Sequence, residues 1–140
     1  MDVKQLAQAA VIDSFNDRSY RQKAKDQVEA NVVVVDKPTG QQVIGPAGYI
    51  QYTDGFVGAM PDLKGTLIDH TVSGNKVTTR IRGQGTFTGT LHMPQGDVPG
   101  NGNKLDLEYQ AETEYNDAGK LVRATFSYDM QAFAKQLGLG

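Results

Sequence analysis

The sequence predicts an α+β fold in which a curved antiparallel sheet wraps around helices near the N-terminus. Apolar residues recur at spacings of three and four between Val3 and Met60, as expected of amphipathic helices. From Leu63 onward the hydrophobic period changes to two, which is typical of half-buried strands. Glycines inside the longest predicted strand, at Gly83, Gly85 and Gly89, favour a bend. Helices followed by bent strands indicate a cone whose interior is only partly filled.

The first half of the chain predicts three helices and one strand. Residues 15–19 end the first helix. Its apolar face is formed by Val3, Leu6, Ala7, Ala10, Val11 and Phe15. Ser19 is suited to cap a second, more polar helix. The β-branched run Val32–Val35 is too short for a helix and predicts a strand buried on both faces. Gly45-Pro46 opens a third helix, since proline is accepted at the first helical position, and Pro61 ends it.

The second half predicts a four-stranded antiparallel meander and a final helix, Met130 to Leu137. The four strands are expected near residues 64–72, 77–90, 104–115 and 121–128. A loop is expected at residues 93–103. Along the third of these strands one face is apolar and the other acidic, so the acidic face must meet water or cations. Arg80 and Arg82 alternate on the preceding strand and are suited to pair with these carboxylates.

Composition excludes several classes of function. With 140 residues the chain predicts one domain, residues 1–140, built on a single core. The net charge of -2 offers no basic stripe, so we expect no nucleic-acid partner. No cysteine and only two histidines leave no basis for a metal site, and we expect no cofactor. No apolar run is long enough to span a bilayer, so we expect no membrane partner and a cytoplasmic protein.

Several motifs, in order along nearly the whole chain, resemble one family. They are Phe15-Asn16-Asp17-Arg18, Val33–Gly40, Gly45-Pro46-Ala47-Gly48, Met60-Pro61-Asp62-Leu63, Gly85-Thr86-Phe87-Thr88-Gly89, Gly119-Lys120-Leu121-Val122 and Gln136-Leu137-Gly138-Leu139. The chain is similar to the SnoaL-like polyketide cyclases (ester cyclases), which belong to the nuclear-transport-factor-two-like, cystatin-like cones. The resemblance implies a deep hydrophobic pocket, a homodimer or tetramer formed through the outer face of the sheet, and cofactor-free acid/base chemistry. Of the two acidic positions that family members carry near the last strand, the first is Phe126 here and the second is Asp129.

Two carboxylates are candidates for a functional role. Asp129 ends the last strand, where the resemblance implies that pockets are built, and is the first candidate for a catalytic general base. Aspartate directly before a helix is equally typical of an N-cap, so a structural interpretation stays open. Asp36 follows the buried strand and is a candidate for substrate binding at the mouth of the cone. Its place in Asp-Lys-Pro-Thr-Gly also fits an Asx turn.

Other side chains are candidates for polar support or for the pocket wall. Histidine as a residue type suits proton transfer, so His92 is the second catalytic candidate. Tyr109 and Tyr115 lie on the apolar face of their strand, where a phenol can bind a ketone or enolate oxygen, although tyrosine is also ordinary core material. Tyr52 and Phe126 complete the predicted substrate-binding set.

Two functions from different classes follow. The first is a small-molecule-binding protein, acting as a cofactor-free cyclase or isomerase on a hydrophobic, polyketide-like carbonyl substrate by acid/base chemistry. The alternative is a non-catalytic ligand-binding or assembly module on the same fold. An epoxide-hydrolase-like site would need an arginine between two carboxylates, for which Arg80 or Arg123 could serve. A carboxylate that faces the pocket with a hydrogen-bonding partner would favour catalysis, whereas a pocket lined only by apolar and phenol groups would favour the binding module.

Overall fold

The N-terminal helices run almost without interruption in the computed structural model, which describes residues 2–93 and 96–139. They are α1 (Val3–Ala7), the π-helical turn η1 (Gln8–Asp13), α2 (Ser14–Asn16) and α3 (Tyr20–Gln27). Asp2 caps α1, and the Ser14 hydroxyl donates to the carbonyl of Ala9, five residues back, at 2.6 Å. The prediction that Ser19 caps α3 is wrong. Its backbone is already helical, and its side chain makes no capping hydrogen bond.

Six strands form one curved sheet in the order β2-β1-β8-β7-β4-β3. Their bounds are β1 (Val28–Asp36), β2 (Gln41–Ile44), β3 (Lys64–Ser73), β4 (Lys76–Thr86), β7 (Lys104–Tyr115) and β8 (Leu121–Ser127). The predicted antiparallel meander is confirmed as β3, β4, β7 and β8. The strand β1 joins it parallel to β8, and β2, which the sequence did not predict, pairs with β1. The predicted α+β architecture is confirmed.

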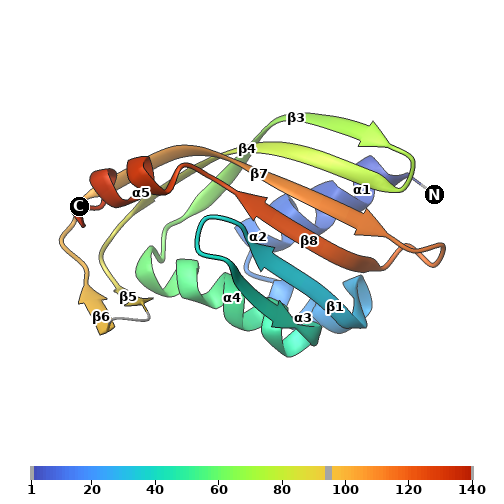
Figure 1. The fold of residues 1–140 in the computed structure, drawn as a ribbon, viewed down its shortest axis with the longest axis horizontal. Helices are drawn as coiled ribbons and strands as arrows, with labels where there is room; N and C mark the ends of the chain where they lie inside the picture. Colours follow the sequence, from blue (N-terminus) through green and yellow to red (C-terminus); the bar gives the residue numbers. More distant parts are fainter. Residues whose placement is uncertain (1, 94–95, 140) are drawn as a thin grey trace.

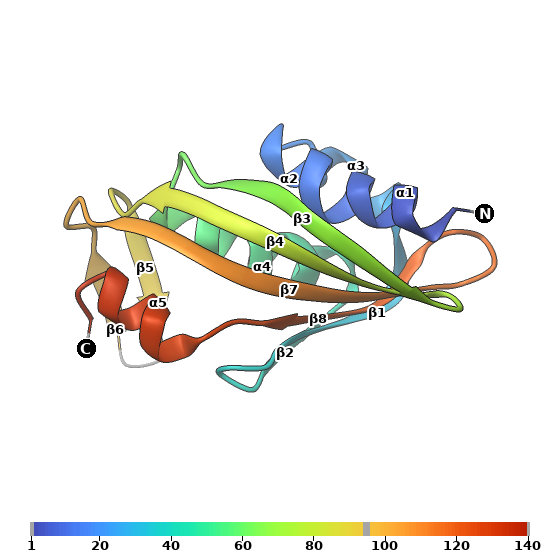
Figure 2. The ribbon, with the colours of Figure 1, turned by 90° about the horizontal axis from the view of Figure 1, so that it is seen from above.

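Two helices close the curved sheet. The helix α4 (Gly45–Ala59) lies beneath the meander, and α5 (Met130–Gln136) lies near the C-terminus (Figure 1). Turned by 90°, the view shows α1 to α3 beside β3, with α4 behind the strands (Figure 2). Both α4 and α5 have the bounds that the sequence predicts to within one residue. The opening Gly45 has a positive φ of 84°, and Pro46 takes the first turn.

The segment predicted as a loop, residues 93–103, contains part of a hairpin. The strands β5 (Thr90–Met93) and β6 (Gly96–Pro99) pair with each other and lie apart from the main sheet. Residues 94 and 95 of the predicted loop lie outside the described residues. The long strand predicted for 77–90 ends at Thr86, because the chain turns at Phe87–Gly89 toward the end of α4, where the Gly89 amide donates to the Ala59 carbonyl at 2.9 Å. The hairpin packs Leu91 and Val98 against the apolar cluster near this turn.

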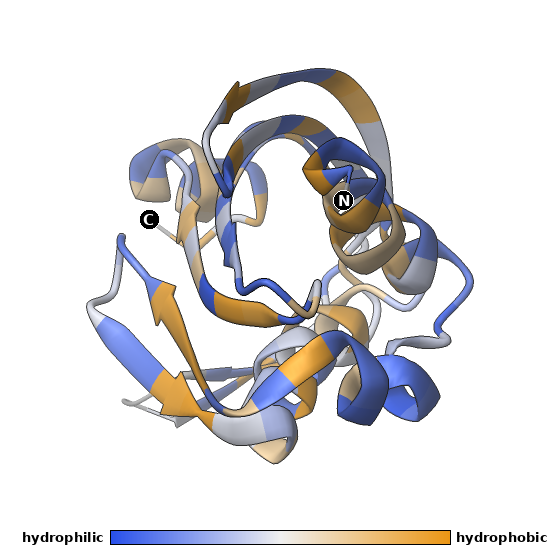
Figure 3. Ribbon diagram, turned by 90° about the vertical axis from the view of Figure 1, so that its right-hand side faces the viewer, coloured by the Kyte–Doolittle hydropathy of each residue, from blue (hydrophilic) through white to orange (hydrophobic). Residues whose placement is uncertain are grey.

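The strand faces follow the hydrophobic pattern in most places. Along β7 the apolar positions are buried or half-buried, and all but one of the acidic positions are exposed, as predicted. Bands of hydrophobic and hydrophilic residues alternate along the curved strands (Figure 3). The prediction that Val32–Val35 is buried on both faces is wrong. Val32 and Val34 are buried, whereas Val33 and Val35 are half-buried, because β1 turns one face outward.

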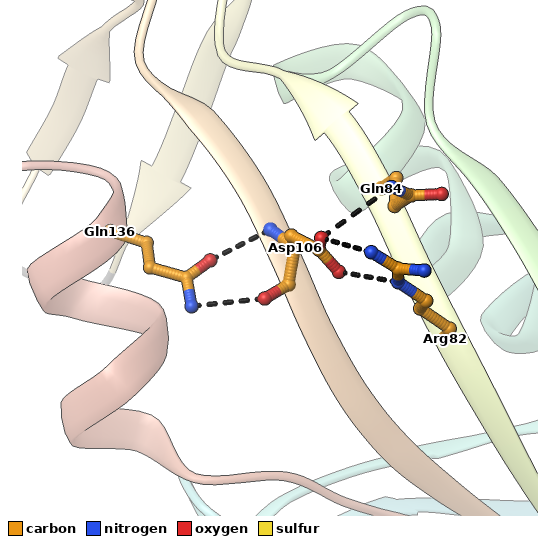
Figure 4. Close-up of polar contacts among 4 residues, drawn as sticks. All are labelled: Arg82, Gln84, Asp106 and Gln136. Atoms are coloured by element: carbon orange, nitrogen blue, oxygen red, sulfur yellow. Dashed lines mark hydrogen bonds and ion pairs between the residues drawn. The ribbon is translucent and has the colours of Figure 1, made fainter.

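Arginines pair with carboxylates on the exposed face of the sheet, as the sequence predicts. Arg80 bridges Asp69 and Glu108, and Arg82 binds both carboxylate oxygens of Asp106. Figure 4 shows how Asp106 also anchors α5: its backbone amide donates to Gln136 at 2.7 Å, and its carbonyl accepts from Gln136 at 3.0 Å. Asp106 lies in the part of β7 that does not pair with β8, which begins its pairing at Gln110. The Gln136 side chain therefore satisfies backbone groups of β7 that no neighbouring strand binds on that side.

Core side chains gather in clusters on the concave side of the sheet. One joins α1, α3, β1 and β8 around residues such as Tyr20, Val34 and Leu121. Another joins the end of α4, β7 and α5 around Met60, Leu105 and Phe133. No helix within residues 2–93 and 96–139 is long and apolar enough to cross a membrane.

Candidate functional site

A cavity of about 90 Å³ lies between the helices and the concave face of the sheet. This volume accommodates several water molecules or the core of a small organic ligand. No charged side chain lines it among the described residues. Aromatic residues form much of its wall: Phe15, Tyr20, Tyr49, Tyr52, Phe56, Tyr109, Phe126, Tyr128 and Phe133. The wall therefore suits an apolar ligand that forms a few hydrogen bonds with phenols.

Asp36 is a buried carboxylate behind one side of this wall. It ends β1, pairs in register with Phe126 of β8, and is only 2% exposed. Tyr52 of α4 donates to its Oδ1 at 2.8 Å, and Tyr128, just after β8, donates to its Oδ2 at 3.2 Å. The Thr39 hydroxyl also donates to Oδ2. Three hydroxyl donors can stabilise a carboxylate that is almost fully buried.

Asp36 begins a turn and also adjoins the cavity. The turn is closed by the Gly40 amide, which donates to the Asp36 carbonyl at 2.8 Å. The expected Asx turn is wrong, because the carboxylate accepts from the Thr39 hydroxyl and from no backbone amide among the described residues, and Pro38 has no N–H to donate. The same carboxylate binds two phenols that line the cavity. The turn therefore holds the carboxylate beside the cavity, so the structural role of Asp36 is compatible with a role in the site.

The phenols beside the cavity are neutral at physiological pH. Burial raises the pKa of Tyr52 well above its usual value, and the negative charge and hydrogen bond of Asp36 raise it further. The same causes, in the same order, raise the pKa of Tyr128. Burial alone raises the pKa of Tyr109. These groups keep their protons, which Tyr52 and Tyr128 donate to Asp36 and which Tyr109 can donate to a ligand.

Tyr109 of β7 is the phenol free to bind a ligand as a donor. Its ring lines the cavity, and its hydroxyl makes no hydrogen bond to any of the described residues. Two glycines make space for it. A Cβ at Gly83 would lie 3.1 Å from the ring, and one at Gly65 would lie 3.4 Å from the hydroxyl oxygen. The sheet therefore leaves room for this side chain on its concave face.

A second carboxylate supports another cavity tyrosine from the outside. Tyr20 of α3 donates to Asp54 of α4, and burial followed by this hydrogen bond raises its pKa to about 12. Arg21 binds the other oxygen of Asp54 at 2.9 Å. Asp54 is therefore charge-balanced within the protein, whereas Asp36 has no Lys, Arg or His partner among the residues described.

The comparisons with known proteins agree on fold and family. The family model described as "SnoaL-like polyketide cyclase" matches residues 5–137. This chain belongs to the SnoaL-like polyketide cyclase family. The predicted resemblance is therefore confirmed.

Solved structures similar to this SnoaL-like chain share its fold at low identity. TsrD from Streptomyces laurentii has a TM-score of 0.80 at 19% identity, covering 100% of this chain and 99% of that one. IdmH from Streptomyces antibioticus has a TM-score of 0.78 at 18% identity, with 99% of each chain covered. A protein with a ketosteroid isomerase-like fold from Catenulispora acidiphila has a TM-score of 0.75 at 13% identity, covering 94% and 92%. No curated protein matches the sequence.

The two positions that the SnoaL-like resemblance makes acidic lie in different surroundings. Phe126 lines the cavity and stacks on Tyr52, with ring centroids 5.2 Å apart. Asp129 is exposed and accepts hydrogen bonds from the amides of Gln131 and Ala132 at 3.0 and 3.2 Å. It does not line the cavity. This position supports the N-cap interpretation, and a catalytic role for Asp129 stays a prediction without structural support.

The remaining predicted residues divide between the cavity and elsewhere. Tyr52 and Tyr109 line the cavity. Tyr115 is buried in the neighbouring core cluster, and its hydroxyl has no partner among the described residues. The side chain of His92 is 69% exposed on the β5–β6 hairpin, where its Nδ1 lies 2.7 Å from Asp97. Neither Tyr115 nor His92 reaches the cavity wall.

Sequence reasoning did not select Tyr128 as a site residue, although a signal was present. It lies two residues after Phe126, so strand parity places both side chains on one face. Arginines 80 and 123, the candidates for an epoxide-hydrolase-like site, do not line the cavity. Within the part of the chain that is described, no three His, Cys, Asp or Glu residues group closely enough to hold a metal ion.

Proposed function

We propose that this protein binds a hydrophobic carbonyl compound in the cavity and catalyses proton transfer next to its carbonyl group, as a cofactor-free cyclase or isomerase. The observation that carries this proposal is the buried Asp36 carboxylate, joined by hydrogen bonds to two phenols of the cavity wall. Asp36 does not face the cavity itself, so it can act on a ligand only through the Tyr52 or Tyr128 hydroxyl that it binds. Acid/base catalysis needs such a group within reach of the substrate, directly or through one intervening group.

The chemistry divides between Tyr109 of β7 and Tyr52 of α4. Tyr109 donates to the carbonyl oxygen and stabilises the enolate that forms there. The proton leaves the neighbouring carbon for the hydroxyl oxygen of Tyr52, whose own proton passes to Asp36 over their 2.8 Å hydrogen bond. The C–H bonding pair becomes the enolate. In an isomerisation, the proton returns from Asp36 through Tyr52 to a different carbon of the substrate. In a ring closure, the enolate carbon attacks a second carbonyl, and the same proton returns from Asp36 through Tyr52 to the new alkoxide oxygen.

The experiment uses 2-tetralone, a bicyclic ketone, in deuterium oxide. We expect the protein to accelerate exchange of its α-protons, measured by NMR, and Asp36→Asn to lower the enzymatic rate about 100-fold. Tyr52→Phe should lower it similarly, because the relay hydroxyl is lost. Asp54→Asn is the matched control: it also removes a carboxylate that binds a cavity tyrosine, and it should keep the rate. Circular dichroism verifies that each variant is folded.

A non-catalytic binding module is the second candidate. The uncharged lining favours it, because none of the carboxylates forms the cavity wall itself. If wild-type protein exchanges the α-protons of 2-tetralone no faster than buffer while still binding it, the catalytic proposal is wrong for such ketones and binding alone is supported.

We also propose self-association through the sheet, as the family resemblance implies. The exposed large apolar side chains lie on its two edge strands: Ile44 on β2, and Leu67, Ile68 and Val72 on β3. Native mass spectrometry should show a dimer or tetramer. A monomer at micromolar concentration would contradict this. The cytoplasmic location and the absence of nucleic-acid partners stay predictions from composition.

A further inference from the structure

The two carboxylates beside the cavity differ in their counter-charge. Each accepts a hydrogen bond from a tyrosine that lines the cavity. Asp54 also binds Arg21, and its side chain is 30% exposed. Asp36 is 2% exposed and binds only hydroxyl groups among the described residues. Buried carboxylates in proteins are normally paired with a cation, but Asp36 has no cationic partner among the described residues, although it adjoins the cavity.

The hydrogen-bonding pattern restricts what can bind on this wall. The hydroxyl protons of Tyr52 and Tyr128 both point to Asp36, so their oxygens can only accept hydrogen bonds from a ligand. A ligand group placed here must therefore be a donor or a cation. A carbonyl or anion would face lone pairs and the charge of Asp36. On the wall of Tyr109, in contrast, the free hydroxyl can donate to an acceptor.

The rings on this side also suit a positive charge. Tyr52 stacks on Phe126, and Phe56 meets Tyr52 edge-on at 5.3 Å between ring centroids. Aromatic faces attract cations, most strongly where water is excluded. Among the described residues, no lysine, arginine or histidine lines the cavity, so no cationic side chain of this set competes for this place.

We infer that the ligand is an organic cation, an amine or ammonium compound whose charged nitrogen lies against Tyr52, Phe126 and Tyr128, with an acceptor oxygen toward Tyr109. The inference deepens the proposed function and rests on the same cavity. A cationic nitrogen near the reacting carbon would also make its C–H bond more acidic. The inference nevertheless concerns recognition alone, so it can be tested without turnover.

The experiment compares two probes of nearly identical shape, N,N,N-trimethylanilinium and tert-butylbenzene, at neutral pH. We expect the cation to bind wild-type protein about 10-fold or more tightly than the neutral probe, measured by NMR titration. In Asp36→Asn the preference should disappear while tert-butylbenzene still binds. Asp54→Asn should keep the preference, because the charge that it removes is already balanced by Arg21.

Equal or tighter binding of the neutral probe to wild-type protein would overturn the inference, as would a preference that survives in Asp36→Asn. The wild-type comparison needs no variant, so the test holds even if Asp36→Asn does not fold. Failure here is distinct from failure of the proposed function. Exchange of 2-tetralone, a neutral ketone, could succeed without any preference for cations, and the preference could exist without exchange.

Discussion

Replacement of Gly89 by alanine is expected to destabilise the protein by about 3 kcal/mol or more. A Cβ at this position would lie 1.8 Å from the Gly58 carbonyl oxygen, and the atom it meets belongs to the backbone. The chain passes close to the end of α4 here, and the Gly89 amide donates to the Ala59 carbonyl at 2.9 Å. Urea unfolding followed by circular dichroism measures the change.

Gly55→Ala is the matched control for this prediction. Gly55 lies inside α4, and a Cβ there would meet nothing within 4 Å. Alanine restricts the unfolded chain and favours a helix, so this variant should be stabilised by about 0.5–1 kcal/mol. If Gly89→Ala unfolds within about 1 kcal/mol of wild type, the close approach of the turn to α4 is not as described.

Alkaline pH is expected to unfold the protein cooperatively. The pKa of Tyr115 is raised by burial from about 10 to about 12, that of Tyr20 is raised to about 12 by burial and by Asp54, and that of Tyr49 is raised further by burial. The unfolded chain loses these protons near pH 10 and the folded chain does not. The stability is therefore fully present below pH 10 and is lost as pH rises toward 12.

The expected loss is large. In this window each of these three buried tyrosines lowers the free energy of unfolding by about 1.4 kcal/mol per pH unit. Together they lower it by about 4 kcal/mol per pH unit, whereas the total stability of a typical protein is about 5–15 kcal/mol. Near-ultraviolet absorbance of phenolate and far-ultraviolet circular dichroism should change together. Gradual phenolate formation near pH 10 with the fold intact would contradict the burial of these side chains.

Helices and strands can be predicted from the sequence where their pattern involves residues that are close together in the chain. The alternation along 104–115 corresponds to β7, and the aspartate at 129 caps α5, because these features depend on side chains close together in the chain. The strand β2 was not predicted. Its four residues, Gln41–Ile44, are mostly exposed, so they carry no clear alternation, and only their pairing with β1 defines them as a strand.

The site depends on contacts between distant segments, which no local pattern contains. Asp36 is recognisable as a turn residue from its own sequence. Its partners come 16 and 92 residues later, from α4 and from the end of β8. The family resemblance directed attention to Asp129, whose distance from the cavity wall becomes evident only when the packing of α5 is known. The alternation of side chains along a strand could have placed Phe126 and Tyr128 on the same face. It could not have shown that either residue lies close to Asp36.

The most direct measurement of the role of Asp36 compares the rates at which Asp36→Asn and Asp129→Asn exchange the α-protons of 2-tetralone in deuterium oxide. Both substitutions remove one carboxylate and keep its shape. We expect Asp129→Asn to retain most of the wild-type rate, because asparagine also caps helices, and Asp36→Asn to fall about 100-fold. The opposite order, with full exchange by Asp36→Asn and loss in Asp129→Asn, would contradict the proposal and return the base to Asp129.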